Sequence, residues 1–255
     1  RDPEMSRGLG DVYKRQVLIT GCNRGIGLSI MRLLAEHGAN IWACCRTIND
    51  AFLEDISELE RIYDVSIKAI QVELTDSILL ARTLDAIIAE KRSIDILINN
   101  AGITATALLQ QTSMEEIRKV FDINYFVPLA IIKKISKIMI RQRDGIIINM
   151  ASVAGIEHQP GRVAYGSSKA ALIWATQGLA KELGAFNIRV NAIAPGAVKT
   201  EMTAGYSEDK IKKIIAETAL HRMGDMIDIA NVVLFLCSKE ASFINGQVIK
   251  VDGGR

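Results

Sequence analysis

Short apolar runs alternate along the chain with longer segments in which apolar residues recur every three or four positions. Bounded apolar runs are typical of buried strands, and the longer repeat is typical of amphipathic helices. Strands are predicted at 16–20, 39–44, 67–72, 94–98, 145–149, 188–193 and 246–251. Helices are predicted at 25–37, 50–62, 76–91, 114–141, 162–183, 208–218 and 226–238. Pro128 interrupts segment 114–141 and predicts either two helices or one kinked helix there.

This alternation predicts an α/β protein. Apolar, β-branched strands are typical of a parallel sheet that is covered by helices on both faces, with right-handed crossovers. We therefore expect one Rossmann-like doubly wound parallel sheet of about seven strands, within a single domain at 16–255. Residues 1–15 are polar and have no apolar signal-peptide core, so we expect a disordered or non-native leader, such as a cloning or sequence-assembly scar.

Composition narrows the range of functions. The net charge is +2, and no basic and aromatic cluster indicates nucleic-acid binding. No uncharged apolar run is long enough for a membrane span. The four cysteines show no CxxC spacing and no histidine neighbours, which favours reduced thiols in a cytoplasmic protein and no metal site.

A glycine-rich turn follows the first predicted strand. Glycines at 21, 25 and 27 leave room for a ligand to approach the backbone, and the helix that follows offers free N–H groups at its start. Such a turn suits a pyrophosphate. The spacing is Gly-x3-Gly-x-Gly, which differs from the common Gly-x-Gly-x-x-Gly dinucleotide fingerprint.

Tyr165 and Lys169 are spaced so that they share one face of a helix, one turn apart. A tyrosine phenol is a poor acid-base catalyst at neutral pH, and a nearby ammonium lowers its pKa. The pair suits proton transfer to a carbonyl oxygen or from an alcohol. Alone, the spacing is also compatible with a partly buried tyrosine beside a solvated lysine.

Together these motifs resemble the short-chain dehydrogenase/reductase family over almost the whole chain. The similarity covers the glycine turn 20–27, the Asn-Asn-Ala-Gly motif at 99–102 and the loop 195–200. It also covers the catalytic tetrad of that family, which is matched here by Asn124, Ser152, Tyr165 and Lys169.

The resemblance implies a role for each residue of this tetrad. Tyr165 is expected to protonate the substrate oxygen, and Ser152 to orient that oxygen. Lys169 is expected to lower the Tyr165 pKa and bind the nicotinamide ribose, and Asn124 to hold a water that links Lys169 to solvent. The implied cofactor site comprises Gly21, Asn23, Arg24, Gly25, Ile26, Gly27, Arg46, Glu73, Leu74, Asn100, Ala101, Gly102, Tyr165, Lys169, Pro195, Gly196, Val198 and Thr200.

Cofactor choice depends on the end of the second strand. Cys45 stands where NAD-dependent members of the family carry an aspartate, and Arg46 follows it. Arg24 and Arg46 could together bind a 2′-phosphate, so we predict NADP(H). Glu73 stands where the family has Asp or Asn beside the adenine, which leaves the Leu74 backbone as the alternative contact.

The C-terminal half is most similar to bacterial 3-oxoacyl-(acyl-carrier-protein) reductases, which implies reduction of an acyl thioester in fatty-acid biosynthesis. Arg143 matches one carrier-docking arginine of those enzymes, whereas Phe186 stands at the second; Lys181 or Arg189 could compensate. The alternatives are a dehydrogenase for a sugar, steroid or secondary-metabolite alcohol, and a non-catalytic NADP(H)-binding regulator. The family also implies a homotetramer or homodimer.

Overall fold

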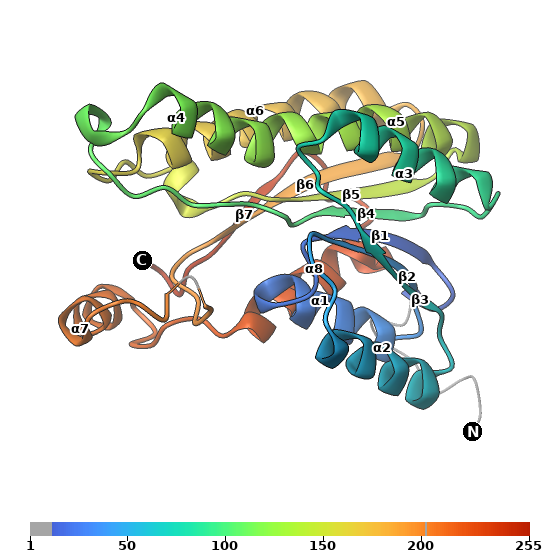
Figure 1. The fold of residues 1–255 in the computed structure, drawn as a ribbon, viewed down its shortest axis with the longest axis horizontal. Coiled ribbons are helices and arrows are strands. Elements are labelled where there is room, and N and C mark those ends of the chain that lie inside the picture. The colour runs from blue at the N-terminus through green and yellow to red at the C-terminus, as the bar shows by residue number, and fades with distance from the viewer. Residues whose placement is uncertain (1–11, 202) are drawn as a thin grey trace.

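The computed structural model describes residues 12–201 and 203–255. Its centre is one seven-stranded parallel sheet in the order β3-β2-β1-β4-β5-β6-β7 (Figure 1). The chain runs outward from β1 to β3, then returns to β4 on the other side of β1, so the direction of winding reverses between β1 and β4. The strands are β1 (Gln16–Thr20), β2 (Asn40–Cys45), β3 (Ile67–Gln71), β4 (Ile96–Asn99), β5 (Gly145–Met150), β6 (Ile188–Pro195) and β7 (Val248–Val251).

Helices cover both faces of this sheet. One face carries α1 (Gly25–Glu36), α2 (Asp50–Tyr63) and α8 (Met226–Cys237), and the other carries α3 (Ser77–Ala89), α4 (Met114–Phe121), α5 (Val127–Gln142) and α6 (Val163–Gly184) (Figure 1). Helix α7 (Glu208–Glu217) lies apart from both layers, beside the C-terminus. The predicted α/β doubly wound fold is confirmed.

The core has two halves that the sheet separates. Ile19 of β1 and Met31 of α1 belong to the half beneath α1, α2 and α8. Leu18 of β1 and Ile135 of α5 belong to the half beneath α3, α5 and α6. Neighbouring β1 residues point to opposite faces because side chains alternate along a strand. Two-sided burial explains why the strands are apolar without a polar alternation.

The long segment after β4 is one continuous helical path whose middle is a π-helix. α4 ends at Phe121, the π-helix spans Asp122–Phe126, and α5 begins at Val127. Pro128 occupies the first turn of α5, where a proline N–H is not needed. The interruption therefore lies before the proline, and the wider turn holds the buried Asn124.

The expected leader extended to residue 15, but the structure places residues 12–15 on the domain. Val12 is fully buried in the core half beneath α1. The Lys14 backbone N–H donates to the Gly38 carbonyl (2.8 Å), and Arg15 contacts Asp144 (2.6 Å). Apolar burial of Val12 is the physical reason for the difference. Residues 1–11 lie outside the described residues.

Within residues 12–201 and 203–255, no helix combines the length and apolar character needed to cross a membrane. In the same ranges, no group of three or more His, Cys, Asp or Glu side chains is arranged to hold a metal ion.

Candidate active site

The glycine turn between β1 and α1 is closely packed against the loop after β4. Gly21 has a φ of +67°, and a Cβ there would lie 2.8 Å from the Ala101 Cα. A Cβ on Gly27 would lie 2.5 Å from the Asn100 Nδ2. Both positions therefore require glycine. A Cβ on Gly25 would meet nothing within 4 Å, so this part of the turn leaves space for the predicted pyrophosphate.

Asn100 and Thr20 fix that turn. The Asn100 side-chain amide donates to the Thr20 carbonyl (3.1 Å) and the Gly21 carbonyl (2.8 Å). The Thr20 hydroxyl accepts from the backbone N–H groups of Asn100 and Ala101, each at 3.1 Å. Asn100 was predicted as a cofactor ligand, and its amide group here also clamps β1 to β4.

Helix α1 begins without a side-chain cap. The residue before it is Arg24, whose side chain makes no capping hydrogen bond, whereas Asn49 caps α2 and Asp76 caps α3. The first N–H groups of α1 therefore remain available, and the helix dipole adds positive potential. A dinucleotide pyrophosphate fits this uncapped end. Ile26 packs against the core behind it.

The end of β2 lies next to the glycine turn. The Asn23 amide donates to the Thr47 carbonyl (2.8 Å), which joins the turn to the loop that carries the exposed Arg46. Cys45 is buried, and burial raises the pKa of its thiol to about 11, so it offers no negative charge to a ribose. This edge therefore has cationic side chains and no carboxylate from β2.

Glu73 and Leu74 follow β3. The Glu73 carboxylate turns back and accepts from the Thr75 hydroxyl (2.9 Å) and backbone N–H (3.3 Å). Leu74 packs against the core half beneath α3. With the Glu73 carboxylate occupied locally, the Leu74 backbone remains the simpler predicted adenine contact.

Tyr165 and Lys169 lie on α6 beside the carboxyl end of β5. Lys169 is buried, and its Nζ donates to the Met150 carbonyl (2.7 Å). A Cβ on Gly102 would lie 3.3 Å from this Nζ and 3.1 Å from the Asn124 Oδ1. The tetrad and the Asn-Asn-Ala-Gly loop are thus direct neighbours, and Gly102 provides the space for the ammonium.

The pKa values of this pair differ from the sequence expectation. Burial raises the pKa of Tyr165, and this is partly offset by a hydrogen bond with Ser152 and by the charge of Arg162. Lys169 is not among the groups that shift the Tyr165 pKa. Burial lowers the pKa of Lys169 itself to about 8. In this structure the Lys169 ammonium donates to the Met150 carbonyl.

Ser152 and Asn124 complete the predicted tetrad. Ser152 follows β5, accepts from the Ala154 N–H (3.2 Å) and lies close enough to Tyr165 to lower the pKa of its phenol. Asn124 is fully buried, and its amide exchanges two 2.9 Å hydrogen bonds with the Ile103 backbone and donates to Ser168 (3.0 Å). The side-chain amide of Asn124 is therefore fully used by protein groups. The predicted water would have to bind a different atom of Asn124.

The segment 196–222, which we call the substrate loop, begins at the end of β6. Gly196 donates its N–H to the Val251 carbonyl (2.9 Å), directly after Pro195. Val198 is buried and forms an isolated bridge with Gly224. The Thr200 N–H donates to the Thr203 hydroxyl (3.0 Å). These bonds place Pro195, Gly196, Val198 and Thr200 on one continuous path beside the sheet edge.

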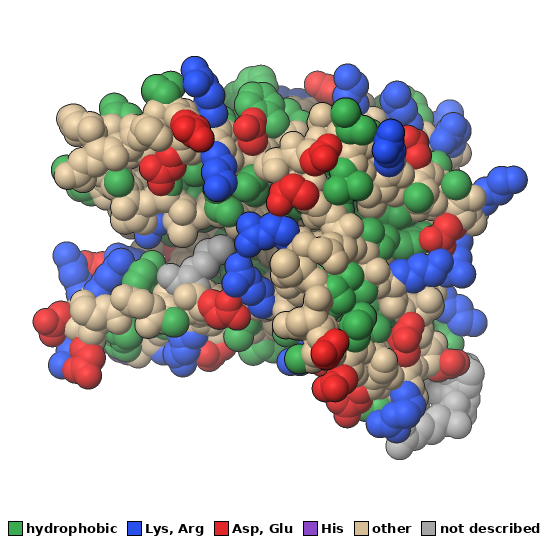
Figure 2. All heavy atoms as spheres, in the orientation of Figure 1, with side chains coloured by type: hydrophobic (Ala, Val, Ile, Leu, Met, Phe, Trp, Pro, Cys, Tyr) green, Lys and Arg blue, Asp and Glu red, His purple; other side chains and the backbone are tan. Residues whose placement is uncertain are grey.

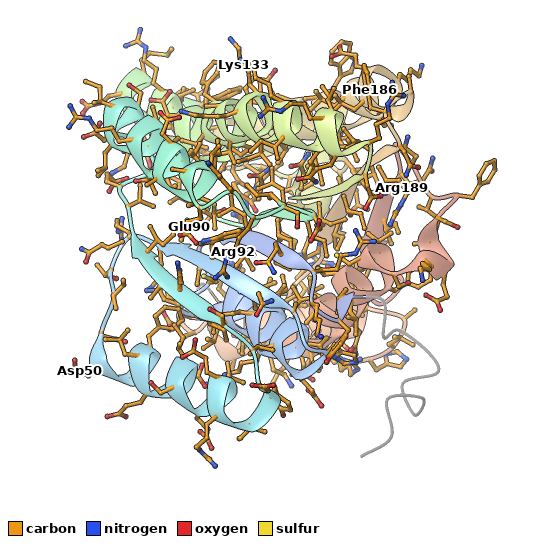
Figure 3. All side chains as sticks on the ribbon, turned by 90° about the vertical axis from the view of Figure 1, so that its right-hand side faces the viewer. Asp50, Glu90, Arg92, Lys133, Phe186 and Arg189 are labelled. Carbon is orange, nitrogen blue, oxygen red and sulfur yellow. The ribbon has the colours of Figure 1, made fainter. Side chains whose placement is uncertain are left out.

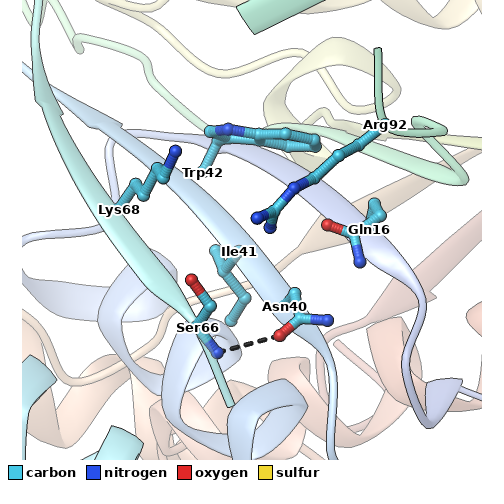
Figure 4. A pocket seen from close by; sticks show the side chains of 7 residues that line it. All are labelled: Gln16, Asn40, Ile41, Trp42, Ser66, Lys68 and Arg92. Atoms are coloured by element: carbon cyan, nitrogen blue, oxygen red, sulfur yellow. Dashed lines mark hydrogen bonds between the residues drawn. The ribbon is translucent and has the colours of Figure 1, made fainter. Parts of the chain in front are cut away.

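The surface is hollowed between the upper helices and the α7 segment, and Lys and Arg side chains gather at the inner end of that hollow (Figure 2). A different, shallow hollow lies at the amino ends of β1 and β2, lined by Gln16, Asn40, Trp42, Lys68 and Arg92 among others (Figure 4). That second hollow is at the opposite edge from the tetrad, so we assign the site to the first.

Comparisons with known proteins agree with this geometry. Residues 21–255 match the family model adh_short_C2, described as enoyl-(acyl carrier protein) reductase. The chain is 37% identical over 245 residues to the 3-oxoacyl-(acyl-carrier-protein) reductase FabG of Chlamydia muridarum, covering 95% of this chain and 98% of that protein. The chain belongs to the short-chain dehydrogenase/reductase family.

Solved structures of short-chain dehydrogenases/reductases share the fold. A putative NAD(P)-dependent gluconate 5-dehydrogenase from Beutenbergia cavernae, with bound NADP, has a TM-score of 0.90 and 31% identity, covering 97% of this chain and 98% of that chain. A 7α-hydroxysteroid dehydrogenase in complex with NADH and a 7-oxo bile acid has a TM-score of 0.90 and 29% identity, covering 96% and 95%. This family binds nicotinamide cofactors, and these two structures hold different ones.

The residues considered for carrier docking in this short-chain dehydrogenase/reductase differ in exposure and in their contacts. Phe186 packs partly against the core. Arg189 donates to the carbonyls of Leu236 (2.7 Å) and Ile244 (3.3 Å), so its guanidinium is used inside the fold (Figure 3). Arg143 and Lys181 are exposed. The backbone contacts of Arg189 disfavour it as a replacement for Phe186, and the exposed Lys181 remains the other expectation.

Sequence reasoning missed three residues of the candidate site. The Arg162 guanidinium lies 5.7 Å from the Tyr165 ring centroid and donates to the Thr104 hydroxyl (2.7 Å). Tyr206 of the substrate loop is close enough to affect the Tyr165 pKa. Glu201 contacts Arg24 (2.8 Å). Arg162 could have been noticed because it lies one helical turn before Tyr165, whereas Glu201 and Tyr206 had no sequence signal.

Proposed function

We propose that this protein is an NADPH-dependent carbonyl reductase whose substrates are 3-oxoacyl thioesters. The observation that carries the proposal is that the Ser152 hydroxyl lies close enough to Tyr165 to affect its pKa, beside the buried Lys169. Two neighbouring hydroxyl groups can each donate a hydrogen bond to one carbonyl oxygen when a substrate lies between them. A pure binding protein does not need this arrangement, which disfavours a non-catalytic regulator.

The chain's own groups support proton delivery in the reduction. Tyr165 keeps its proton because its pKa is raised, so it acts as a general acid toward the substrate oxygen. Ser152 hydrogen-bonds the same oxygen and holds it toward the phenol. Lys169, held by Met150, carries a charge below pH about 8 that favours negative charge on neighbouring oxygen atoms. NADPH, when bound, would supply the hydride for the carbonyl carbon.

NADPH is preferred in this proposal because Arg24 and Arg46 border the cofactor turn and Cys45 supplies no carboxylate. The uncapped start of α1 supports pyrophosphate binding. The similarity to the Chlamydia reductase supports the acyl-thioester substrate. An acyl-carrier protein would present that thioester in the cell, in fatty-acid biosynthesis.

A second candidate is a dehydrogenase for a sugar or steroid alcohol. It is favoured by the residues at the expected carrier-docking positions: Phe186 is partly buried, and Arg189 is bound to backbone carbonyls. A face that lacks this second free cation binds an acidic carrier less strongly. The gluconate and hydroxysteroid dehydrogenases with the same fold support this alternative.

The test is oxidation of NADPH, followed by its absorbance, with acetoacetyl-CoA as a carrier mimic and with NADH in parallel. The proposal expects turnover with NADPH and much slower turnover with NADH. Absence of turnover while NADPH still binds would transfer the assignment to the second candidate. A panel of keto-sugar acids and oxo-steroids would then identify the carbonyl class.

We also propose a homotetramer with a homodimer as its building unit. Trp174 of α6 is 76% exposed, and Met114 of α4 is 60% exposed, on the helices that flank the tetrad. Exposed large apolar side chains on neighbouring helices are typical of interfaces between subunits. Light scattering in solution checks this, and a monomeric mass would contradict it.

A further inference from the structure

An ion pair joins the glycine turn to the substrate loop. The Arg24 Nη1 lies 2.8 Å from the Glu201 Oε2, although the two residues are 177 positions apart. Their side chains are 62% and 67% exposed. Arg24 directly precedes α1, and Glu201 directly follows Thr200, which is another residue of the proposed cofactor site. The contact therefore connects two parts of the proposed cofactor site.

Neighbouring carboxylates pair with other cations, so Glu201 is the carboxylate that binds Arg24. Lys199 of the same loop contacts Asp225 (3.2 Å), and Glu208 at the start of α7 contacts Lys212 (3.9 Å). Across 12–201 and 203–255, no second carboxylate lies within ion-pair distance of Arg24. Arg46 makes no ion pair within the same ranges, so it stays available to a ligand.

We propose that Glu201 is a specificity-determining residue that competes with the cofactor 2′-phosphate for Arg24. This inference rests on the proposed cofactor site. A 2′-phosphate bound by Arg24 and Arg46 places negative charge beside the Glu201 carboxylate, which must give up its contact or be repelled. A cofactor without that phosphate leaves the Arg24–Glu201 contact intact. Glu201 therefore lowers the preference for NADP(H) over NAD(H).

The size of the effect follows from exposure. Pairs between solvent-exposed side chains are weak, so release of Arg24 from Glu201 should tighten NADPH binding roughly two- to fivefold. Salt screens such contacts, so the difference should shrink as ionic strength rises. NADH binding should stay unchanged, because it does not require Arg24 to leave its partner.

The experiment measures dissociation constants of NADPH and NADH, by cofactor fluorescence, for the wild type and for Glu201→Gln. The matched control is Glu208→Gln, which removes the same charge from the same loop at a site that pairs with Lys212. Arg24→Gln and the double variant complete a cycle that isolates the contact. The proposal expects tighter NADPH binding in Glu201→Gln alone, and no gain from this change in the Arg24→Gln background.

Other outcomes overturn the inference. Equal gains for NADPH and NADH, or the same gain in Glu208→Gln, would indicate a general charge effect. Weaker binding of both cofactors would make Glu201 a structural clamp of the loop. If the wild type binds NADPH and Glu201→Gln leaves its affinity unchanged, the competition is refuted while the proposed function stands. If the wild type binds no NADPH, both are refuted.

Discussion

The inner side of the proposed site and the substrate loop are held by different kinds of interaction. Beneath the tetrad, buried polar groups bond one another and the backbone: Lys169 to Met150 (2.7 Å), Asn149 to Thr176 (2.9 Å). The substrate loop adds charged pairs at the surface to the backbone contacts of its two ends. Glu217 contacts Arg255 (2.6 Å) there.

Because of this difference, the inner side of the site is expected to be rigid and the substrate loop to be adjustable. A buried group that loses its partner costs more free energy than an exposed ion pair contributes, so the inner side has one arrangement. Exposed pairs are weakened by salt and exchange partners at little cost. The side chains of the proposed active site are therefore positioned before a ligand arrives, whereas the loop can adapt to different ligands. Proteins of one fold and different substrates need both properties.

The largest effect is expected from Tyr165→Phe on the fixed side. Loss of the phenol removes the general acid, so kcat should fall by about 10²- to 10⁴-fold. NADPH binding should change little, because the Phe ring keeps the shape. Steady-state kinetics and cofactor titration check both parts. Carbonyl reduction near the wild-type rate would refute the role of Tyr165.

Asn124→Ala should also act strongly, through stability. It leaves the Ile103 N–H and carbonyl without their 2.9 Å partners. Ile103 is partly buried, and an unpaired buried group costs about 1–3 kcal/mol, so the free energy of unfolding should fall by about that amount. Denaturant unfolding measures the loss. A change as small as that of an exposed pair would contradict the contrast between the two regions.

The pH dependence of reduction should be moderate. The Lys169 pKa is about 8, so its charge is lost above that pH while Tyr165 stays protonated. We expect kcat/KM for carbonyl reduction to fall above pH 8, by up to about tenfold per pH unit.

The same group gives a stability test with a defined sign. The unfolded chain binds the Lys169 proton up to about 10.5, whereas the folded chain releases it near 8. The contribution of Lys169 to stability therefore rises with pH between these values. Thermal unfolding of the wild type and of Lys169→Met across this range checks it, and an identical pH dependence in both proteins would contradict the lowered pKa.

The smallest effect is expected from Glu217→Gln in the loop. Loss of its contact with Arg255 should change the free energy of unfolding by at most about 1 kcal/mol. The change should decrease further in high salt. Denaturant unfolding at two salt concentrations checks this. A loss comparable to that of Asn124→Ala would show that the loop is as rigidly fixed as the inner side.

The sequence predicted the sheet well because its strands are buried on both faces. β1 was predicted with its observed bounds, 16–20, and β4 was displaced by only one or two residues. β7 was predicted to begin at 246 but begins at Val248, after Gly246 with a φ of +71°. Strand ends depend on such turns, whereas the apolar runs alone identify the strands.

The site was less accessible to sequence reasoning. The π-helix has no local sequence signal, since Asn124 is held by Ile103 from another segment. The Tyr165–Lys169 spacing indicates a shared helix face but cannot say that the lysine reaches Met150. The Arg24–Glu201 contact joins residues too far apart for any pattern to indicate. Local periodicity predicts elements, whereas these contacts arise only when the elements pack.

The reversal of winding between β1 and β4 has a consequence for how the chain acquires its structure. The glycine turn is closed by Asn100, which is 79 residues after Gly21, and Lys169 is fixed by Met150 only when α6 has docked. Closing such distant pairs is slow, because the entropy of the intervening chain is lost first. During refolding, helix content should therefore recover before the proposed cofactor site forms. The cofactor can then bind only to a molecule that is almost completely folded.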